Sequence, residues 1–355
     1  MSRFLDKKLS ALVAYTPGEQ PKNVSELIKL NTNENPYPPS PKVIEAIDRA
    51  ELEKLRLYSD PNCTPLIESI AAFHGLEPDN VFPGNGSDEV LALLFHGFCA
   101  NGAAFPDITY GFFKVYAQMF GVEAIIVPLR DDFSVDTEDY AGTNATVFVA
   151  NPNAPTGICL PAAKIEALLR QSPDRLVVID EAYVEFGGES AVPLLAAYDN
   201  LLIVRTFSKS HSLAGARIGY ALGSRELITA LNTLKFSFNP YNINRLSMLA
   251  GAASMDDVAY FGETRRKIIE DREYTSAEFR CLGFKVLESR ANFIFAGGHP
   301  NIGAELYFRS LRENGILVRY FSEPRIDDYV RITIGTSEQM RTLVSVTETI
   351  LRTLN

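Results

Sequence analysis

One lysine stands among hydroxyl groups and small residues just beyond an apolar run of the chain. The run at residues 201–204 (Leu-Leu-Ile-Val) is typical of a buried strand, and Lys209 follows close to its end. A lysine in such a place is costly unless its amine does chemistry or meets a partner. Nearby Thr206, Ser208 and Arg217 offer the hydroxyl groups and the guanidinium that bind a phosphate monoester. The pattern predicts a lysine that forms a Schiff base with a phosphorylated aldehyde, pyridoxal phosphate (PLP).

This stretch resembles the lysine motif of the fold-type I PLP-dependent aminotransferases. Other segments that are similar to motifs of that family occur in the family's order along nearly the whole chain, and together they make the resemblance specific. They lie at residues 30–37, 84–89, 151–157, 180–183 and 330–336. Within the family, the chain is most similar to the histidinol-phosphate aminotransferases.

The composition is that of an ordinary globular chain. Its 355 residues suggest about two domains, and its net charge of −10 argues against a nucleic-acid partner. Neither the four cysteines nor the four histidines show metal-site spacing, so we expect reduced thiols, a cytoplasmic location and no metal. We also expect no membrane association, because the chain shows no signal peptide and no run of ~20 apolar residues.

Short apolar runs alternate with helical patterns between residues 80 and 240. Strands are expected at 146–150, 176–179, 201–207 and 218–222, and helices at 162–170 and 225–234. Continuous apolar strands separated by helices imply a mostly parallel sheet that is covered on both faces. Three of the strands end where polar residues begin, at Asn151, Asp180 and Thr206, and open α/β sheets place their ligand site there.

The pattern changes after about residue 245. Long helical stretches at 256–282, 302–314 and 338–354 flank short strands at 293–296 and 330–334. We therefore predict an α/β protein with a large domain at residues 31–245 and a smaller C-terminal α/β domain at residues 246–355. The resemblance implies that the large domain holds PLP on a mostly parallel sheet of the seven-stranded type. It also implies that an arm at residues 1–30 packs with the small domain.

Local signals predict where two helices begin. Ser40 precedes Pro41 and Thr64 precedes Pro65, so each hydroxyl is expected to be an N-cap with proline at the first helical position. Gly75 is expected to end the second of these helices.

The resemblance implies roles for the residues around the cofactor's ring. Lys209 would hold PLP and then move a proton between the substrate carbon and the cofactor carbon. Asp180 would face the pyridine nitrogen, where a charge pair at about 4 Å contributes roughly 4 kcal/mol at an effective dielectric of 20. Tyr183 would donate to the cofactor's phenolic oxygen, and Tyr110 would stack on the ring. Taken alone, Asp180 is also typical of a helix N-cap, and each tyrosine is typical of a core aromatic.

The cofactor's phosphate group is expected at the start of a helix, because free backbone N–H groups there bind phosphate and glycine lets the backbone approach. The residues expected to form this cup are Gly86, Ser87, Asp88, Thr206, Ser208 and Arg217. By resemblance, Tyr58 reaches the phosphate group held by a neighbouring subunit, so the enzyme would be at least a homodimer.

Arg331 lies in an expected strand amid β-branched residues, and a buried, unpaired arginine would be prohibitive. The resemblance implies that Arg331 clamps the substrate's carboxylate, or the phosphate group of histidinol phosphate, which has no carboxylate. Arg319 and Tyr15 match further substrate contacts, although an ordinary structural ion pair remains open for Arg319.

One position departs from the family pattern. The family commonly has an asparagine directly before Pro-Thr-Gly that donates to the cofactor's phenolic oxygen, and this chain has Ala154 there. We expect that either Asn153 or Tyr183 alone donates to the phenolic oxygen instead.

The resemblance implies a cytoplasmic, homodimeric aminotransferase that exchanges amino groups between L-histidinol phosphate and 2-oxoglutarate. Three alternatives remain open. They are a threonine-phosphate decarboxylase, an aromatic amino acid aminotransferase, and a PLP-binding regulator without turnover. The regulator is disfavoured, because such proteins carry a DNA-binding module ahead of this fold and only about 30 residues precede the asparagine-rich motif here.

Overall fold

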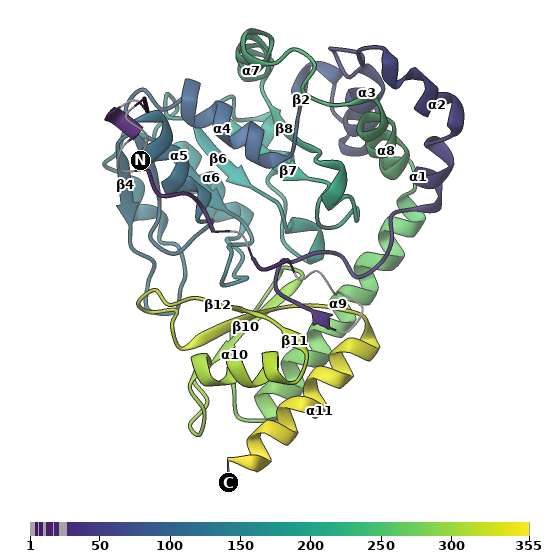
Figure 1. The fold of residues 1–355 in the computed structure, drawn as a ribbon. Coiled ribbons are helices and arrows are strands. Elements are labelled where there is room, and N and C mark those ends of the chain that lie inside the picture. Colours follow the sequence, from purple (N-terminus) through teal and green to yellow (C-terminus); the bar gives the residue numbers. More distant parts are fainter. Residues whose placement is uncertain (1–3, 6, 10–11, 17, 21–26, 355) are drawn as a thin grey trace.

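The computed structural model describes residues 4–5, 7–9, 12–16, 18–20 and 27–354, and this part of the chain forms two units, one above the other in Figure 1. Among the described residues, no helix combines the length and apolar content needed to cross a membrane. The same residues contain no group of three or more His, Cys, Asp or Glu side chains that could hold a metal ion.

The upper unit is built on a seven-stranded sheet in the order β2-β8-β7-β6-β5-β3-β4. The strands are β2 (Val81–Gly84), β3 (Ala103–Pro106), β4 (Ala124–Val127), β5 (Thr146–Ala150), β6 (Val177–Asp180), β7 (Leu201–Thr206) and β8 (Gly219–Gly223). Neighbouring strands are parallel except at β8, which is antiparallel to both β2 and β7. The prediction of a mostly parallel sheet is therefore confirmed.

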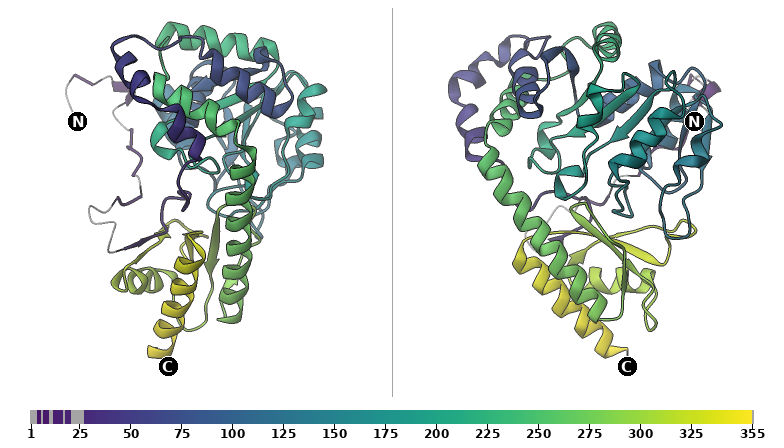
Figure 2. Two further views of the ribbon diagram at one scale, coloured as in Figure 1. Left: turned by 90° about the vertical axis from the view of Figure 1, so that its right-hand side faces the viewer. Right: turned by 180° about the vertical axis from the view of Figure 1, so that it is seen from behind.

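Helices cover both faces of this sheet (Figures 1 and 2). They are α1 (Pro41–Ala46), α2 (Arg49–Glu53), α3 (Thr64–His74), α4 (Ser87–Gly97), α5 (Phe112–Phe120), α6 (Ala162–Arg170), α7 (Arg225–Phe238) and α8 (Arg245–Met255). Short 3-10 turns occur at Lys7–Leu9, Lys54–Arg56, Pro78–Asn80, Thr137–Tyr140, Val184–Phe186, Val192–Ala196 and Ala214–Ala216.

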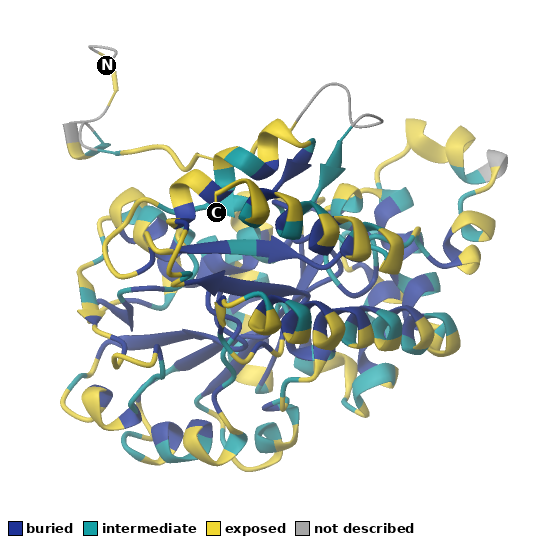
Figure 3. Cartoon of the chain, turned by 90° about the horizontal axis from the view of Figure 1, so that it is seen from below, coloured by how far each residue is buried: buried dark blue, intermediate teal, exposed yellow. Residues whose placement is uncertain are grey.

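Alternate side chains of the central strands enter two different hydrophobic clusters. Val177 and Ile179 pack with residues of α3, α6 and α8, whereas Val178 packs with residues of α4 and α5. Each fully buried aliphatic side chain contributes about 1.5–3 kcal/mol relative to exposure. Figure 3 shows the result, in which buried strands lie inside helices whose outer faces are exposed.

The lower unit contains an antiparallel sheet in the order β12-β13-β10-β9, from β9 (Lys285–Val286), β10 (Phe293–Gly297), β12 (Arg319–Tyr320) and β13 (Tyr329–Thr333). Helices α10 (Ala304–Glu313) and α11 (Ser337–Thr353) pack with it. The arm joins this unit, because β1 (Ile28–Lys29) pairs in parallel with β11 (Ile316–Leu317). The long helix α9 (Val258–Cys281) runs from the upper unit down into the lower one (Figures 1 and 2).

The expected domain boundary at residue 245 coincides with the start of α8. Met248 and Ala250 of α8 are buried in the same cluster as Leu66 of α3 and Ile179 of the seven-stranded sheet. Since α8 buries its apolar side chains there, it belongs with the upper unit. We propose that the lower unit begins within α9 instead.

Of the two predicted N-caps, one is correct and one is wrong. The Ser40 hydroxyl accepts from the backbone N–H of Lys42 at 3.1 Å. At α3, however, the N-cap is Cys63, and Thr64 is the first helical residue. The carboxylate of Asp60 accepts from the backbone N–H of Thr64 at 2.9 Å and so satisfies the first N–H of the helix. Gly75 ends α3 in the left-handed conformation, as predicted.

Candidate active site

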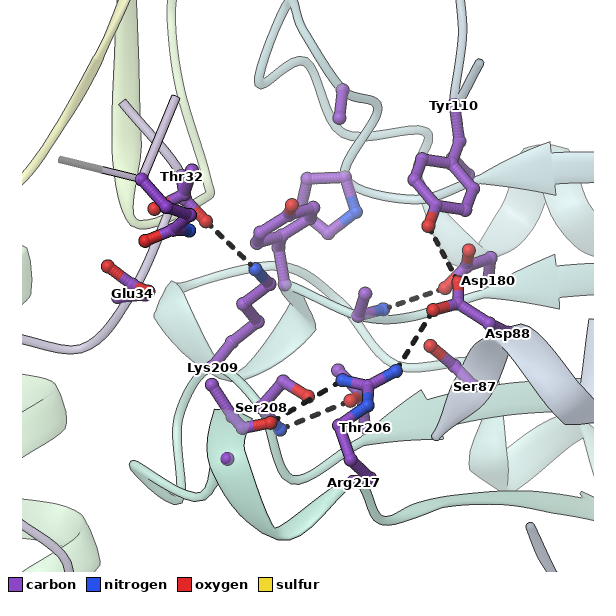
Figure 4. A pocket seen from close by; sticks show the side chains of 18 residues that line it. Thr32, Glu34, Ser87, Asp88, Tyr110, Asp180, Thr206, Ser208, Lys209 and Arg217 are labelled. Atoms are coloured by element: carbon purple, nitrogen blue, oxygen red, sulfur yellow. Dashed lines mark hydrogen bonds and ion pairs between the residues drawn. The ribbon is translucent and has the colours of Figure 1, made fainter. Parts of the chain in front are cut away.

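A cavity of about 400 Å³ opens where β5, β6 and β7 end and the N-terminal arm crosses the molecule (Figure 4). We call it the Lys209 cavity. It is lined by Gln20, Thr32, Glu34, Ser87, Asp88, Tyr110, Ala150, Pro152, Ala154, Asp180, Ala182, Tyr183, Thr206, Ser208, Lys209, Ala214, Gly215 and Arg217. It thus gathers most of the residues that the sequence predicts for the cofactor.

Lys209 extends into this cavity from the loop after β7. Its Nζ donates to the backbone carbonyl of Thr32 at 3.2 Å and lies 5.8 Å from the centre of the Tyr183 ring. Among the described residues, no carboxylate lies within ion-pair distance of this amine. Because the amine has no anionic partner to hold it, it is available to a ligand inside the cavity.

Asp180, the last residue of β6, carries a carboxylate that is buried at the floor of the cavity. One of its oxygens accepts from the backbone N–H of Ala182 at 3.1 Å. Burial, together with the nearby carboxylates of Asp88 and Glu181, raises the pKa of Asp180 to about 7, although the Ala182 N–H and Lys209 act to lower it. An anion that is so poorly compensated favours a cationic group in front of it.

The other end of the cavity is lined by hydrogen-bond donors. Helix α4 begins at Ser87, and its N-cap, Gly86, has a φ of +78°. A Cβ atom at Gly86 would lie 2.6 Å from Nη2 of Arg217, so only glycine leaves room for this guanidinium. Arg217 itself is held in a left-handed conformation, with a φ of +54°, which is uncommon for a side chain of this size. Backbone N–H groups at the start of α4 and the guanidinium therefore meet at one place.

Tyr110 and Arg217 are both tied to Asp88. The Tyr110 hydroxyl donates to one carboxylate oxygen at 2.7 Å, and Arg217 Nη2 lies 3.1 Å from the other (Figure 4). Burial and the Asp88 carboxylate hold the pKa of Tyr110 well above its usual value, so this phenol stays protonated. Asp88 thus orients the predicted ring-stacking residue and the predicted phosphate-binding arginine together.

Asn153, a predicted cofactor-binding residue, does not line the Lys209 cavity. Its amide donates to the Ile108 carbonyl at 3.0 Å and to the Thr156 hydroxyl at 3.1 Å. It lines a second cavity of about 340 Å³ instead. Its neighbour Ala154 faces the Lys209 cavity, and the two adjacent side chains in this turn point to different sides.

The two predicted substrate-binding arginines lie face to face on neighbouring strands of the lower unit. Arg319 of β12 is the register partner of Arg331 of β13, and both guanidinium groups lie over the ring of Phe321. Arg331 donates to the Asn31 carbonyl at 3.0 Å, yet its buried Nε has no hydrogen-bond partner. Within the described ranges, no carboxylate is near enough to form an ion pair with either arginine. An ordinary structural ion pair therefore does not account for Arg319.

The guanidinium group of Arg331 interacts electrostatically with three tyrosines of the site. Burial lowers the pKa of Arg331, and its electrostatic neighbours include Tyr183, Tyr15 and Tyr110. Tyr15 comes from the arm, and its ring centre lies 4.3 Å from that of Phe112 in α5. Tyr15, Arg319 and Arg331 do not line the Lys209 cavity themselves, but Arg331 interacts electrostatically with Tyr110 and Tyr183, which do.

Tyr58, a predicted cofactor residue, lies on the molecular surface. It is 79% exposed and stacks on Tyr241 with ring centres 4.4 Å apart. It is absent from the lining of the Lys209 cavity in its own chain.

Sequence reasoning missed the part played by the asparagine loop, residues 31–35. Thr32 and Glu34 line the cavity, and Thr32 accepts from Lys209. The amide of Asn35 donates to the backbone carbonyl of Lys209 at 3.0 Å. The motif at residues 30–37 marked this loop, but nothing in its sequence showed that it meets Lys209.

Comparison with known proteins agrees with this geometry. The family model described as aminotransferase class I and II matches residues 25–346. The chain belongs to the class I and II aminotransferases. It is 50% identical over 355 residues to the histidinol-phosphate aminotransferase of Marinomonas sp. (strain MWYL1), which covers 99% of this chain and 100% of the relative. The Clostridium acetobutylicum histidinol-phosphate aminotransferase is 50% identical over 342 residues, which cover 96% of this chain and 97% of the relative.

A solved structure shows the same architecture as this aminotransferase. The histidinol-phosphate aminotransferase of Sinorhizobium meliloti, solved in complex with pyridoxal-5'-phosphate, superposes with a TM-score of 0.87 at 25% identity and covers 100% of this chain and 99% of its own. The predictions of a fold-type I architecture, of a transaminase and of its cofactor are confirmed.

The residues of the Lys209 cavity fit PLP. The cavity contains an unpaired amine for the aldehyde, a poorly compensated buried carboxylate for the ring nitrogen, and a helix start with a guanidinium for the phosphate group. The glycine at position 86 keeps the backbone there accessible.

Proposed function

We propose that this aminotransferase moves amino groups between L-histidinol phosphate and 2-oxoglutarate with PLP as its cofactor, the histidinol-phosphate aminotransferase step of L-histidine biosynthesis. The main support for this proposal is the Lys209 cavity. There the amine of Lys209, which has no carboxylate partner among the described residues, lies with the buried carboxylate of Asp180 and the hydrogen-bond donors at the start of α4. The 50% identity to histidinol-phosphate aminotransferases over 99% of the chain supports the substrate.

Bound PLP supplies an aldehyde that condenses with amines and a ring that withdraws electrons from the attached carbon. Asp180 would hold the ring nitrogen in its protonated form, since a cationic group there would stabilise its buried carboxylate. Lys209 would move the proton at the substrate carbon once its amine is free, because its Nζ lies inside the cavity, where it donates to the Thr32 carbonyl. Tyr110 covers the ring, and Asp88 fixes its orientation.

Arg331 and Arg319 select the anionic end of the substrate. Their guanidinium groups lack a carboxylate of the described chain, so a substrate phosphate or carboxylate can pair with them. A pair of arginines suits the dianionic phosphate of histidinol phosphate in one half-reaction. The same groups would hold a glutamate carboxylate in the other half-reaction, which explains how one pocket serves two donors.

We further propose that the enzyme is a cytoplasmic homodimer. Support for the dimer comes from the exposed apolar side chains near Tyr58, which include Leu55, Leu57, Phe238 and Tyr241. A phenol so exposed, stacked on a second exposed ring, is suited to reach a phosphate group held by the neighbouring subunit.

A panel of amino donors with 2-oxoglutarate, scored by kcat/KM, tests the proposed substrate. We expect L-histidinol phosphate to exceed phenylalanine and tyrosine by at least ~100-fold, because these amino acids lack the phosphate group that the arginines would bind. A higher kcat/KM for the aromatic amino acids would contradict the substrate. Release of carbon dioxide from threonine phosphate without amino transfer would show a decarboxylase instead.

A further inference from the structure

The Tyr183 hydroxyl accepts a hydrogen bond from a side chain that sequence reasoning did not single out. Nδ2 of Asn33 lies 3.0 Å from this oxygen. Asn33 is 1% exposed and has a φ of +55°, a left-handed conformation that asparagine tolerates better than most residues. A buried asparagine held in this conformation next to a cavity residue calls for an explanation.

The hydrogen bonds around Asn33 form one consistent chain of donors and acceptors. The Asn33 backbone N–H donates to the Thr333 hydroxyl oxygen at 2.9 Å. That hydroxyl must therefore use its own proton elsewhere, and it donates to Oδ1 of Asn33 at 3.0 Å. With Oδ1 facing Thr333, the NH₂ group of the amide must face Tyr183. Asn292 completes the arrangement by donating to the Asn33 carbonyl at 3.0 Å.

This chain of bonds decides where the Tyr183 proton points. Because the phenolic oxygen accepts from Asn33, its O–H must point away from that amide, and Tyr183 lines the Lys209 cavity. The side chain that precedes Pro155 is the methyl group of Ala154, and the amide of Asn153 is occupied by Ile108 and Thr156. Neither residue can donate into this part of the cavity in place of Tyr183.

We propose that Asn33 is a positioning residue that directs the Tyr183 hydroxyl proton toward the phenolic oxygen of the bound cofactor. This inference rests on the proposed function, since it requires PLP in the Lys209 cavity. A donor at that oxygen stabilises its anionic form and so lowers the pH at which the cofactor linked to Lys209 loses its proton.

The same chain of bonds reaches the strand that holds the substrate anchor. Thr333 lies two residues after Arg331 in β13, so both side chains leave the same face of the strand. Arg331 donates to the Asn31 carbonyl, two residues before Asn33 in the asparagine loop. The position of β13 thus controls both the anion site and the orientation of the Tyr183 donor.

Asn33→Asp tests the proposal in the holoenzyme, because aspartate has the same shape and tolerates the left-handed conformation. Its carboxylate accepts the Tyr183 proton and withdraws it from the cavity. We expect the midpoint of the visible absorbance titration of the bound cofactor to rise by about one pH unit, as in Tyr183→Phe. In the double variant with Tyr183→Phe, Asn33→Asp should add nothing further.

Two changes at Thr333 provide a second, independent test. Thr333→Val removes the hydroxyl that fixes the amide and should raise the titration midpoint, whereas Thr333→Ser keeps the hydroxyl and should leave the midpoint where it is. If the Asn33→Asp protein does not fold, the difference in titration midpoint between Thr333→Val and Thr333→Ser still tests the proposal.

An unchanged midpoint in Asn33→Asp or Thr333→Val, beside a raised one in Tyr183→Phe, would contradict the role of Asn33 and leave the proposed function intact. Additive shifts in the double variant would also contradict it, because they would show a merely structural effect. A wild-type protein without any visible cofactor absorbance would refute the proposed function itself.

Discussion

At the scale of single residues, chemistry could be predicted from residue type but orientation could not. Lys209 was predicted from its hydroxyl-rich surroundings and Asp180 from the family resemblance, and both line the same cavity. The sequence could not show that Ala154 and its neighbour Asn153 line different cavities, because it does not reveal which side of a turn each side chain faces. Asn33 was missed because the orientation of its side chain depends on a left-handed backbone conformation and on a hydrogen bond from Thr333, 300 positions away.

The raised pKa of Asp180 predicts a pH-dependent stability of the cofactor-free protein. The folded protein binds this proton more tightly than the unfolded chain, so the free energy of unfolding falls as the pH rises from about 4 to about 7. We expect Asp180→Asn to remove about 2 kcal/mol of this fall. Urea unfolding of both proteins at pH 5 and pH 8, without cofactor, measures the difference. Equal losses in the two proteins would show that Asp180 is not the group responsible.

At the scale of elements, the hydrophobic periodicity predicted most strands and helices. It did not predict the N-cap of α3 or the pairing of the short strands. The helix at Ala162–Arg170 and the strand at Thr146–Ala150 have the predicted limits. The start of α3 was assigned to the wrong cap because Asp60, four residues before Thr64, reaches across the turn. The pairing of β12 with β13, which places Arg319 opposite Arg331, depends on register that short strands do not reveal.

This pairing predicts that both half-reactions share one anion site. Arg331→Ala should lower kcat/KM by about 100-fold or more for histidinol phosphate and for glutamate alike, since a charge-assisted anchor is lost. Arg309→Ala serves as a control, because Arg309 lies exposed on α10 and pairs with Glu305. Steady-state kinetics with each donor provide the measurement. Loss with only one donor would show that the two substrates use separate anchors.

At the scale of the whole molecule, the sequence predicted two units and a mostly parallel sheet in the larger one. The boundary at residue 245 stays a prediction, and we propose a later one because α8 packs with α3, a contact between segments far apart in the chain. The arm is shared between the units. Its strand β1 pairs with β11, while Tyr15 lies against α5.

The exposure of Tyr58 predicts a site that is completed by a second chain. Hybrid dimers of a Lys209→Ala chain and a Tyr58→Phe chain should contain one intact site, with Lys209 from one subunit and Tyr58 from the other. We expect such hybrids to regain about half of the wild-type activity per dimer. Purified hybrids carrying two different tags allow this comparison with the Tyr58→Phe homodimer. Hybrids that are no more active than that homodimer would mean that Tyr58 does not act across subunits.

The central claim is that the amine of Lys209 binds the cofactor covalently. Borohydride reduction of the holoenzyme, followed by peptide mapping, tests it most directly. We expect one reduced adduct per chain, on the peptide that contains Lys209, and none in Lys209→Ala. An adduct on another lysine, or no adduct in the wild-type protein, would contradict this account.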